Sequence, residues 1–256
     1  MKRISRITVT SRPALLGAVV MLAVTSASVA SADDGPGPFG VTADVVATRR
    51  TVRVGALFGA DRADKLPGGH FCTASVVDSP KGNLLVTAAH CVDGAASKLV
   101  FAPGYRDGQA PYGVWKVGKR YLPDGWAKDK DEDSDLAFVS VENLHGKPIE
   151  DAVGANRFTA GTATGATAVT VIGYPDSRDV PISCTNKPKA HSRTQQRIDC
   201  PAFTGGTSGS PWINGDDQVV GVLGGHEQGG STDDVSYSVV LGKGAAELYK
   251  DATANG

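Results

Sequence analysis

The 256-residue sequence has almost no net charge, because 26 basic residues are balanced by 27 acidic residues and the formal charge is −1. A chain without a strong positive field has no general electrostatic attraction to nucleic acid or to acidic membranes. We therefore expect no nucleic-acid partner.

Long apolar runs are also missing beyond the first 32 residues, where no segment approaches the roughly 20 apolar residues that span a bilayer. The first residues differ. A basic stretch ends at Arg12, an apolar run follows over Ala14–Val24, and small residues end in Ala30-Ser31-Ala32. This order is typical of a secretory signal peptide with an A-x-A cleavage site.

The alternative for this segment is a membrane anchor, which its short apolar run disfavours. We expect a signal peptide over residues 1–32 and a secreted, extracellular product with no membrane contact after cleavage. Residues 33–45 are rich in Asp, Gly and Pro, and we expect a leader or short propeptide over 33–50. The folded domain is then expected over 51–256, which is long enough for one large or two small cores.

Helical patterns and internal repeats are nearly absent from this domain, and only Gly244–Lys250 reads as a helix. The 32 glycines and 14 prolines indicate many turns between short elements. Many short strands with tight turns predict an all-β fold, either a sandwich or a barrel. The expected strands are Thr51–Phe58, His70–Val77, Leu84–Ala89, Lys98–Ala102, Tyr112–Tyr121, Leu136–Val141, Ala166–Gly173, Val219–Leu223 and Val235–Leu241.

Only four cysteines are present. An even number in an exported protein favours disulfides over metal binding, and four cysteines allow three connectivities, which the sequence does not choose between. No second His or Cys lies at metal-ligand spacing near His90. The acidic run over 129–135 does not fit a calcium loop, because Ser134 stands where the sharp turn needs Gly and Ser140 where a bidentate Glu is needed. We expect no metal.

Three segments carry the residue types of nucleophilic acyl transfer. His90 directly follows an apolar strand, which can hold one ring nitrogen toward a cleft, and Cys91 beside it could fix the turn by bonding Cys72. Asp135 is the last carboxylate before an apolar strand and is the one best placed to be buried, where an imidazole N–H is a suitable partner. Its neighbours at 131 and 133 are expected to be exposed.

The third segment surrounds Ser208. Gly205, Gly206 and Gly209 free the backbone to present the hydroxyl outward in a tight turn, and such a turn can aim successive N–H groups at one point. A glycine- and serine-rich surface loop is the alternative. Pro211-Trp212 argues against it, because the segment runs straight into packed structure.

The segments Thr-Ala-Ala-His-Cys, Asp-Leu-Ala-Phe and Gly-Thr-Ser-Gly-Ser-Pro occur in the chain order His, Asp, Ser. Together they resemble the three signatures of the chymotrypsin-like (trypsin-like) serine peptidases, and the bacterial secreted branch in particular. The resemblance extends from about Thr51 to the terminal helix. It implies two antiparallel six-stranded β-barrels with a short C-terminal helix, with His90 and Asp135 in the first barrel and Ser208 in the second.

The resemblance also implies the function of a secreted serine endopeptidase that hydrolyses peptide bonds through an acyl-enzyme intermediate. Ser208 would be the nucleophile, and the N–H groups of Gly206 and Ser208 would bind the oxyanion. We expect polypeptide substrates, no cofactor and a monomer. The implied disulfides are Cys72–Cys91 and Cys184–Cys200.

The sequence departs from the family at Thr207, where the animal enzymes carry an Asp that pairs with a newly cleaved N-terminus. Thr207 cannot form that ion pair, so we do not expect this activation mechanism. Activation by removal of a leader is the alternative, and Arg49-Arg50 is a candidate processing site.

The specificity pocket is expected from Ala202, Leu223 and Gly225. Trypsin-like specificity would need Asp at 202, and Leu223 takes the place where bacterial glutamyl-specific relatives carry a histidine. The sequence therefore predicts a weak preference for a neutral residue on the acyl side, and His226 would reach the pocket only in a shifted register. His70, His145 and His191 have no motif context and are given no role.

Three other classes of protein share some of these features. An inactive protease homologue that serves as an extracellular binding module is the main alternative, although such homologues often lack a triad residue. An α/β-hydrolase esterase orders its triad Ser, Asp, His and alternates strands with helices, which this sequence does not. A β-sandwich binding domain would explain the strands and disulfides but not the three signatures.

Overall fold

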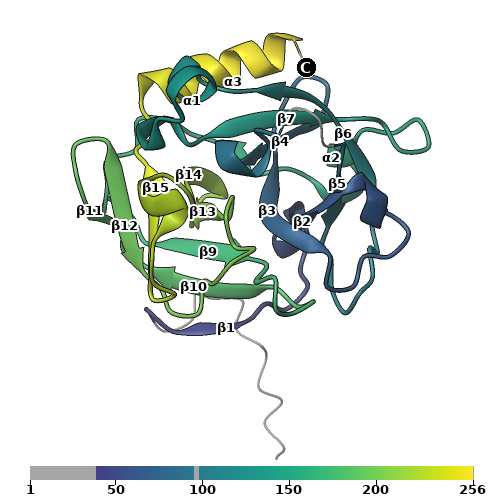
Figure 1. Cartoon of the computed structure of the whole chain (residues 1–256), viewed down its shortest axis with the longest axis horizontal. Coiled ribbons are helices and arrows are strands. Elements are labelled where there is room, and N and C mark those ends of the chain that lie inside the picture. Colours follow the sequence, from purple (N-terminus) through teal and green to yellow (C-terminus); the bar gives the residue numbers. More distant parts are fainter. Residues whose placement is uncertain (1–38, 95–97, 256) are drawn as a thin grey trace, which may run out of the picture. The chain divides into compact units, whose positions relative to one another are not determined.

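The computed structural model describes residues 39–94 and 98–255, in which strands predominate (Figure 1). The expected signal peptide and the first part of the expected leader lie outside these residues. None of the helices in the described part of the chain has the length and apolarity needed to cross a membrane. The fold class predicted from the sequence is confirmed, since the strands form two antiparallel β-structures and the chain ends in a helix.

The first half is a closed barrel in the order β2-β3-β4-β7-β6-β5. Successive side chains of a strand point to opposite faces, so Ala137, Val139 and Val141 face the barrel core while Phe138 faces outward. This alternation gives the barrel an apolar interior and a second apolar surface outside it. The strands are β2 Val54–Gly59, β3 His70–Val77, β4 Leu84–Thr87, β5 Leu99–Pro103, β6 Trp115–Tyr121 and β7 Ala137–Val141.

The second half contains a six-stranded sheet in the order β1-β10-β9-β13-β14-β8 and a three-stranded sheet in the order β11-β12-β15. Strands β8 and β14 pair in parallel, and the other strand pairs within the described residues are antiparallel. The strands are β1 Thr42–Asp44, β8 Arg157–Phe158, β9 Val169–Gly173, β10 Ile182–Asn186, β11 Lys189–Ala190, β12 Gln195–Asp199, β13 Pro211–Asn214, β14 Gln218–Val222 and β15 Val235–Val239.

Disulfide and hydrogen-bond contacts join these two sheets into a second barrel-like ring. Between β10 and β12, the Cys184–Cys200 disulfide is accompanied by a hydrogen bond of 2.7 Å from Asn186 Nδ2 to the Asp199 carbonyl. Between β14 and β15, the Val222 N–H donates to Ser238 Oγ at 2.9 Å. The ring encloses an apolar core around the fully buried Trp212.

Short helices cover the outside of the strands. The terminal helix packs Tyr249 and Ala252 against Phe138 and Phe158 on the outer face of the first barrel. It is longer than the helix predicted over 244–250. The helices are α1 Asp124–Asp129, α2 Ile149–Val153 and α3 Lys243–Asn255, and the 3-10 turns are η1 Thr51–Arg53, η2 Ala60–Arg62, η3 Ala89–Cys91, η4 Glu132–Ser134 and η5 His226–Gly229.

Part of the segment expected to be a leader belongs to the fold. Strand β1 pairs with β10, the Thr42 hydroxyl donates to the Pro201 carbonyl at 2.5 Å, and Val45 is only 5% exposed. Arg50 forms an ion pair of 3.3 Å with Asp217. A three-residue strand leaves no clear periodic signal in the sequence, whereas the open edge of β10 offers it N–H and C=O groups to pair with.

Candidate active site

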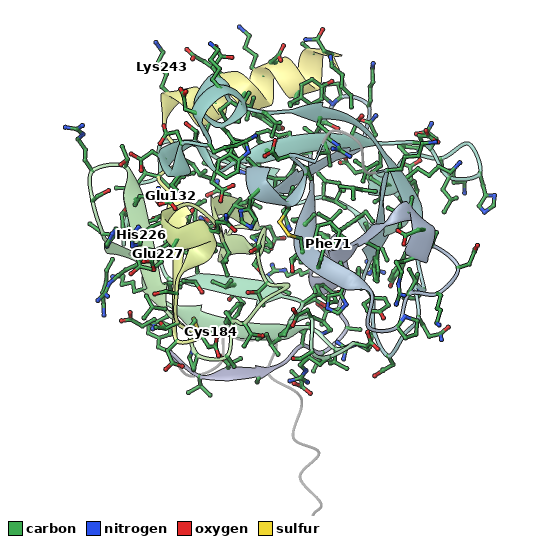
Figure 2. All side chains as sticks on the ribbon, in the orientation of Figure 1. Phe71, Glu132, Cys184, His226, Glu227 and Lys243 are labelled. Atoms are coloured by element: carbon green, nitrogen blue, oxygen red, sulfur yellow. A yellow bond between two sulfur atoms is a disulfide. The ribbon has the colours of Figure 1, made fainter. Side chains whose placement is uncertain are left out.

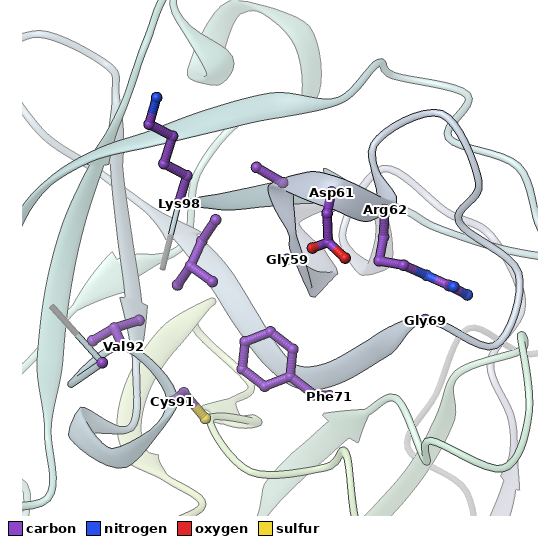
Figure 3. Close-up of a pocket in the computed structure, with 11 residues that line it drawn as sticks. Gly59, Asp61, Arg62, Gly69, Phe71, Cys91, Val92 and Lys98 are labelled. Carbon is purple, nitrogen blue, oxygen red and sulfur yellow. The ribbon is translucent and has the colours of Figure 1, made fainter. Parts of the chain in front are cut away.

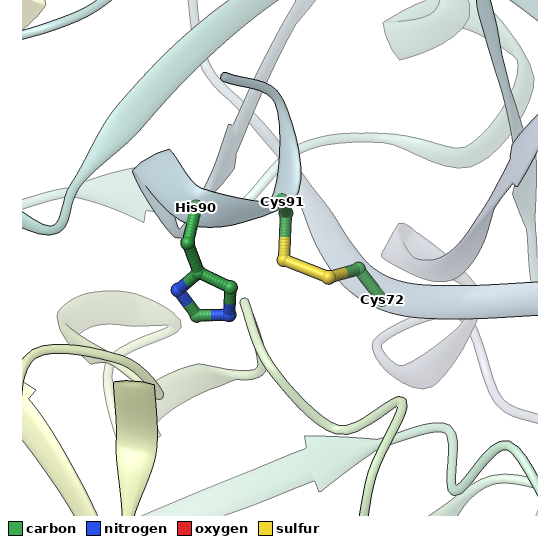
Figure 4. Close-up of side chains that lie close together, drawn as sticks. All are labelled: Cys72, His90 and Cys91. Atoms are coloured by element: carbon green, nitrogen blue, oxygen red, sulfur yellow. A yellow bond between two sulfur atoms is a disulfide. The ribbon is translucent and has the colours of Figure 1, made fainter. Parts of the chain in front are cut away.

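His90 lies in η3, a single turn that follows β4. The Cys72–Cys91 disulfide ties this turn to β3, with the two Cα atoms 6.1 Å apart. Figure 4 shows the imidazole of His90 beside the disulfide. The side chain of His90 is 14% exposed, so its ring is mostly enclosed but reaches solvent.

Asp135 lies two residues before β7, directly after η4, and its side chain is fully buried. Its carboxylate accepts three hydrogen bonds. His90 Nδ1 lies 2.7 Å from Oδ2, the Gly225 N–H donates to the same oxygen at 2.8 Å, and the His90 N–H donates to Oδ1 at 3.0 Å. These contacts compensate for the loss of hydration of the carboxylate. They also place the ring proton of His90 on Nδ1, because a carboxylate accepts, which leaves Nε2 free to accept a proton.

The loop around Ser208 is held against the first barrel. The Thr73 N–H of β3 donates to the Ser208 carbonyl at 2.7 Å, and the Gly209 N–H donates to the Leu223 carbonyl at 2.7 Å. Because Thr73 is the neighbour of Cys72, the same stretch of β3 holds both the Ser208 loop and the turn that carries His90. The glycines on either side, Gly206 and Gly209, have φ angles of +87° and +84°, which residues other than glycine rarely adopt.

Within the described residues, the N–H groups of Gly206 and Ser208 have no hydrogen-bond acceptor, and the same holds for Thr204 and Gly205 at the start of the loop. Thr207 between them is 1% exposed, and its hydroxyl donates to the Thr204 carbonyl at 2.6 Å. The polar group at this position is therefore satisfied within the loop itself, without a charged chain terminus.

The segment after β14 runs beside the Asp135 carboxylate and then contains three residues with positive φ angles. Gly225, Glu227 and Gln228 have φ angles of +80°, +49° and +55°, which is costly for the two residues with side chains. The ring of His226 in this segment packs against His191 at a tilt and against Tyr237 edge to face, with ring centroids 4.8 Å away in both cases. Figure 2 shows His226, Glu227 and Glu132 close together at the surface.

Two cavities flank the turn that carries His90 and Cys91. One, of about 680 Å³, surrounds the exposed ring of Phe71 (Figure 3), and its lining includes Gly59, Asp61, Arg62, Cys91 and Lys98. The other, of about 320 Å³, is lined by His90, Asp93, Trp126, Lys130, Glu132 and Gln228. The His90 turn therefore borders open space on two sides.

Cys72, His90 and Cys91 are the one group of potential metal ligands that lies close together within residues 39–94 and 98–255. Both sulfur atoms are bonded to each other. Because thiolates, and not disulfide sulfurs, ligate metals, this group does not fit a metal ion.

The three residues expected to form a specificity pocket lie in different surroundings. Ala202 is exposed and has a φ of +68°, Leu223 is 3% exposed in the core of the second half, and Gly225 contacts Asp135. Neither cavity beside His90 includes any of them. Their role as a pocket stays a prediction.

Two contacts of the site were missed by reasoning from the sequence. The Gly225 N–H that binds Asp135 belongs to the backbone, and no residue type signals it. Thr73 carries a weak signal, since it is a polar residue within the apolar run His70–Val77. Its meaning depends on a partner that lies more than 130 residues away.

A family model described as a trypsin-like peptidase domain matches residues 72–222 of the chain. This range covers more than half of the chain and includes the His90, Asp135 and Ser208 segments. No curated protein matches the chain.

Solved structures are similar over most of the chain. The protease Anisep from Arthrobacter nicotinovorans is 26% identical with a TM-score of 0.72, over 84% of this chain and 100% of that one. The thermostable serine protease AL20 from an extremophilic microorganism is 26% identical with a TM-score of 0.69, over 82% of this chain and 100% of that one. A Glu endopeptidase solved in complex with MPD shares the fold at 21% identity, with a TM-score of 0.69 over 86% of this chain and 99% of that one.

Proposed function

The chain belongs to the trypsin-like peptidase family, and from this premise we propose that it is a secreted serine endopeptidase with His90, Asp135 and Ser208 as its catalytic triad. The observation that carries the proposal is the buried Asp135 carboxylate, 2.7 Å from His90 Nδ1. A buried carboxylate in this contact orients the imidazole and stabilises its protonated form. A histidine that acts as general base on a serine hydroxyl needs both this orientation and this stabilisation.

The reaction proceeds by acyl transfer. Ser208 Oγ attacks the carbonyl carbon of the scissile peptide bond while His90 Nε2 takes the hydroxyl proton. The C–N bond then breaks as His90 gives this proton to the leaving amine, which leaves an ester between Ser208 and the acyl half of the substrate. Water, activated by the same histidine, hydrolyses the ester. No step needs a metal or an organic cofactor.

The unpaired N–H groups of Gly206 and Ser208 are the proposed oxyanion hole. Hydrogen-bond donors that are already in place when negative charge develops on the substrate oxygen stabilise the transition state without reorganisation. The Ser208 loop meets this requirement because its glycines hold left-handed φ angles and Thr207 bonds within the loop. Activity would therefore not depend on a newly formed N-terminus.

Residues 1–32 are proposed to be a signal peptide, which two disulfides support, because such bonds persist in oxidising compartments. A leader, if it is removed, is proposed to end upstream of Gly40 and not at Arg49-Arg50. Cleavage at the arginine pair would release β1 from β10 and break the Arg50–Asp217 ion pair.

Polypeptides are the proposed substrates, and the cavity lined by His90 gives a substrate chain open space beside the imidazole. We keep the prediction of a neutral residue on the acyl side of the cleaved bond, because Ala202 and Leu223 supply no charge there. A panel of chromogenic peptides that differ only at this residue tests it. Fastest turnover on Arg, Lys or Glu would contradict the prediction.

Labelling with a fluorophosphonate probe tests the proposed nucleophile. The probe reacts with a serine that its neighbours activate, so we expect the secreted protein to be labelled and Ser208→Ala to remain unlabelled. Ser192→Ala, which changes an exposed serine, is the matched control and should be labelled like the natural protein. Absence of labelling in a folded sample with both disulfides intact would instead favour the inactive binding module.

A further inference from the structure

Thr73 lies in the middle of β3 and is completely buried. Its hydroxyl makes two hydrogen bonds to segments far away in the sequence. It donates to the Gly206 carbonyl at 3.1 Å and accepts from the Tyr174 N–H at 3.0 Å. A side chain of the first barrel thus holds one of the two residues of the proposed oxyanion hole.

The segment that begins at Tyr174 returns to the same loop. Two residues later, the Asp176 N–H donates to the Gly205 carbonyl at 2.8 Å. The Pro175 carbonyl between them lies 2.9 Å from His70 Nε2, which must donate because a carbonyl only accepts. His70, given no role from the sequence, is thereby seen to anchor this segment to the start of β3.

These contacts fix both peptide groups that flank Gly206. The Gly205 carbonyl is bound to Asp176, and the Gly206 carbonyl is bound to Thr73. In a trans peptide the C=O and the N–H point in opposite directions, so binding of the Gly205 carbonyl turns the Gly206 N–H away from Asp176. Gly206 has no side chain to restrict its rotation, and these two bonds supply the restriction instead.

We infer that Thr73 is a positioning residue of the oxyanion hole: its hydroxyl, together with the 174–176 segment that it anchors, sets the direction of the Gly206 N–H. The inference rests on the proposed function, because it concerns the same reaction. Thr73 does not touch substrate. It acts through Gly206, and its removal should weaken the binding of the transition state more than the binding of the substrate.

Thr73→Val tests the role of the hydroxyl, because valine keeps the branched shape and loses the two hydrogen bonds. Loss of a whole oxyanion donor lowers kcat by about 100- to 1,000-fold, and for a misdirected donor we expect a fall of about 10- to 100-fold with little change in KM. Thr73→Ser keeps the hydroxyl and should restore most of the activity. If Thr73 had only a structural role, its loss would not lower kcat while leaving KM almost unchanged.

A second readout follows the oxyanion directly. A peptidyl trifluoromethyl ketone accepts Ser208 Oγ at its carbonyl carbon, and the former carbonyl oxygen becomes an oxyanion in the hole. The inhibition constant of this compound should rise in Thr73→Val by the same factor by which kcat/KM falls. Thr185→Val is the matched control, since it removes another buried threonine hydroxyl, bonded at 2.8 Å to Thr170 on β9. It should leave both quantities unchanged.

An exposed position gives an independent variant if Thr73→Val does not fold. Asp176→Pro removes the N–H that binds the Gly205 carbonyl together with the carboxylate, and Asp176→Ala, which keeps the N–H, is the control for the carboxylate. We expect the same fall in kcat in Asp176→Pro and almost none in Asp176→Ala. Full activity of the folded Thr73→Val protein, or of Asp176→Pro, would overturn the inference. Failure of the natural protein to react with a fluorophosphonate would overturn the proposed function itself, and the two failures are thereby distinguishable.

Discussion

In the first half of the molecule, six strands close into a ring through backbone pairing. In the second half a disulfide, side-chain contacts and a backbone hydrogen bond from Gly224 to Tyr237 bridge the gaps between sheets. The halves also carry different parts of the site. His90 and Asp135 lie at strand ends of the closed barrel, and the Ser208 loop with its left-handed glycines belongs to the second half. A continuous backbone ladder suits groups whose mutual distance must be fixed, and glycine-rich connections suit backbone donors that need unusual φ angles.

The largest expected effect comes from breaking the hydrogen bond between Asp135 and His90 in the closed barrel. In Asp135→Asn the amide cannot hold the imidazole in the required tautomer, and we expect kcat to fall by about 10,000-fold while the protein stays folded. Asp133→Asn is the matched control. Its carboxylate lies two residues earlier at the surface and binds Thr194 and Gln195, so kcat should be almost unchanged. Equal losses in both variants would contradict the role given to Asp135.

The two disulfides offer a direct comparison of the halves, because they close loops of similar length, with sequence separations of 19 and 16. Replacing either pair with alanine should lower the free energy of unfolding by about 2–4 kcal/mol. Only loss of Cys72–Cys91 should also lower kcat of the folded protein, since that bond holds the His90 turn. Denaturant titration together with active-site titration measures both quantities. A fall in kcat only after loss of Cys184–Cys200 would reverse the comparison.

A smaller effect is expected where side-chain contacts close the second half. Ser238→Ala leaves the buried Val222 N–H without its acceptor, which should cost about 1–3 kcal/mol of unfolding free energy. Ser236→Ala is the control, because Ser236 lies on the same face of β15 and is also buried, but makes no side-chain hydrogen bond within the described residues. If the two variants are equally stable, the Ser238 contact does not hold β14 to β15.

The smallest expected effect is on the pH dependence of stability and involves Glu150 in the first half of the molecule. Burial, followed by the nearby charges of Asp78 and Asp151, raises the pKa of Glu150 in the folded state above its ordinary value. The folded protein therefore holds this proton more tightly than the unfolded chain, and the resulting stability is present at low pH and lost as the pH rises through the raised pKa. Glu150→Gln should raise the melting temperature slightly at neutral pH and not at pH 4. A larger gain at pH 4 than at neutral pH would show the opposite sign.

The strands of the first half were predicted more fully than those of the second. His70–Val77 coincides with β3, since an apolar run of eight residues between turn residues is a clear strand signal. Strands β10 and β12 were missed because they carry Ser, Thr, Gln, Arg and Asp, and the region 176–199 reads as a loop insertion. Their place is decided by pairing with β9 and β15, which the local sequence does not reveal.

The sequence by itself determined the fold class, the family and the three triad candidates, because each depends on local patterns: strand alternation, glycine-rich turns and short motifs in a fixed order. Only the tertiary structure decided how these parts meet. It placed Asp135 against His90, put β1 on the edge of β10 and brought Thr73 to the carbonyl of Gly206. Such contacts join residues far apart in the chain, and their geometry follows from the packing of the whole fold and not from any one segment.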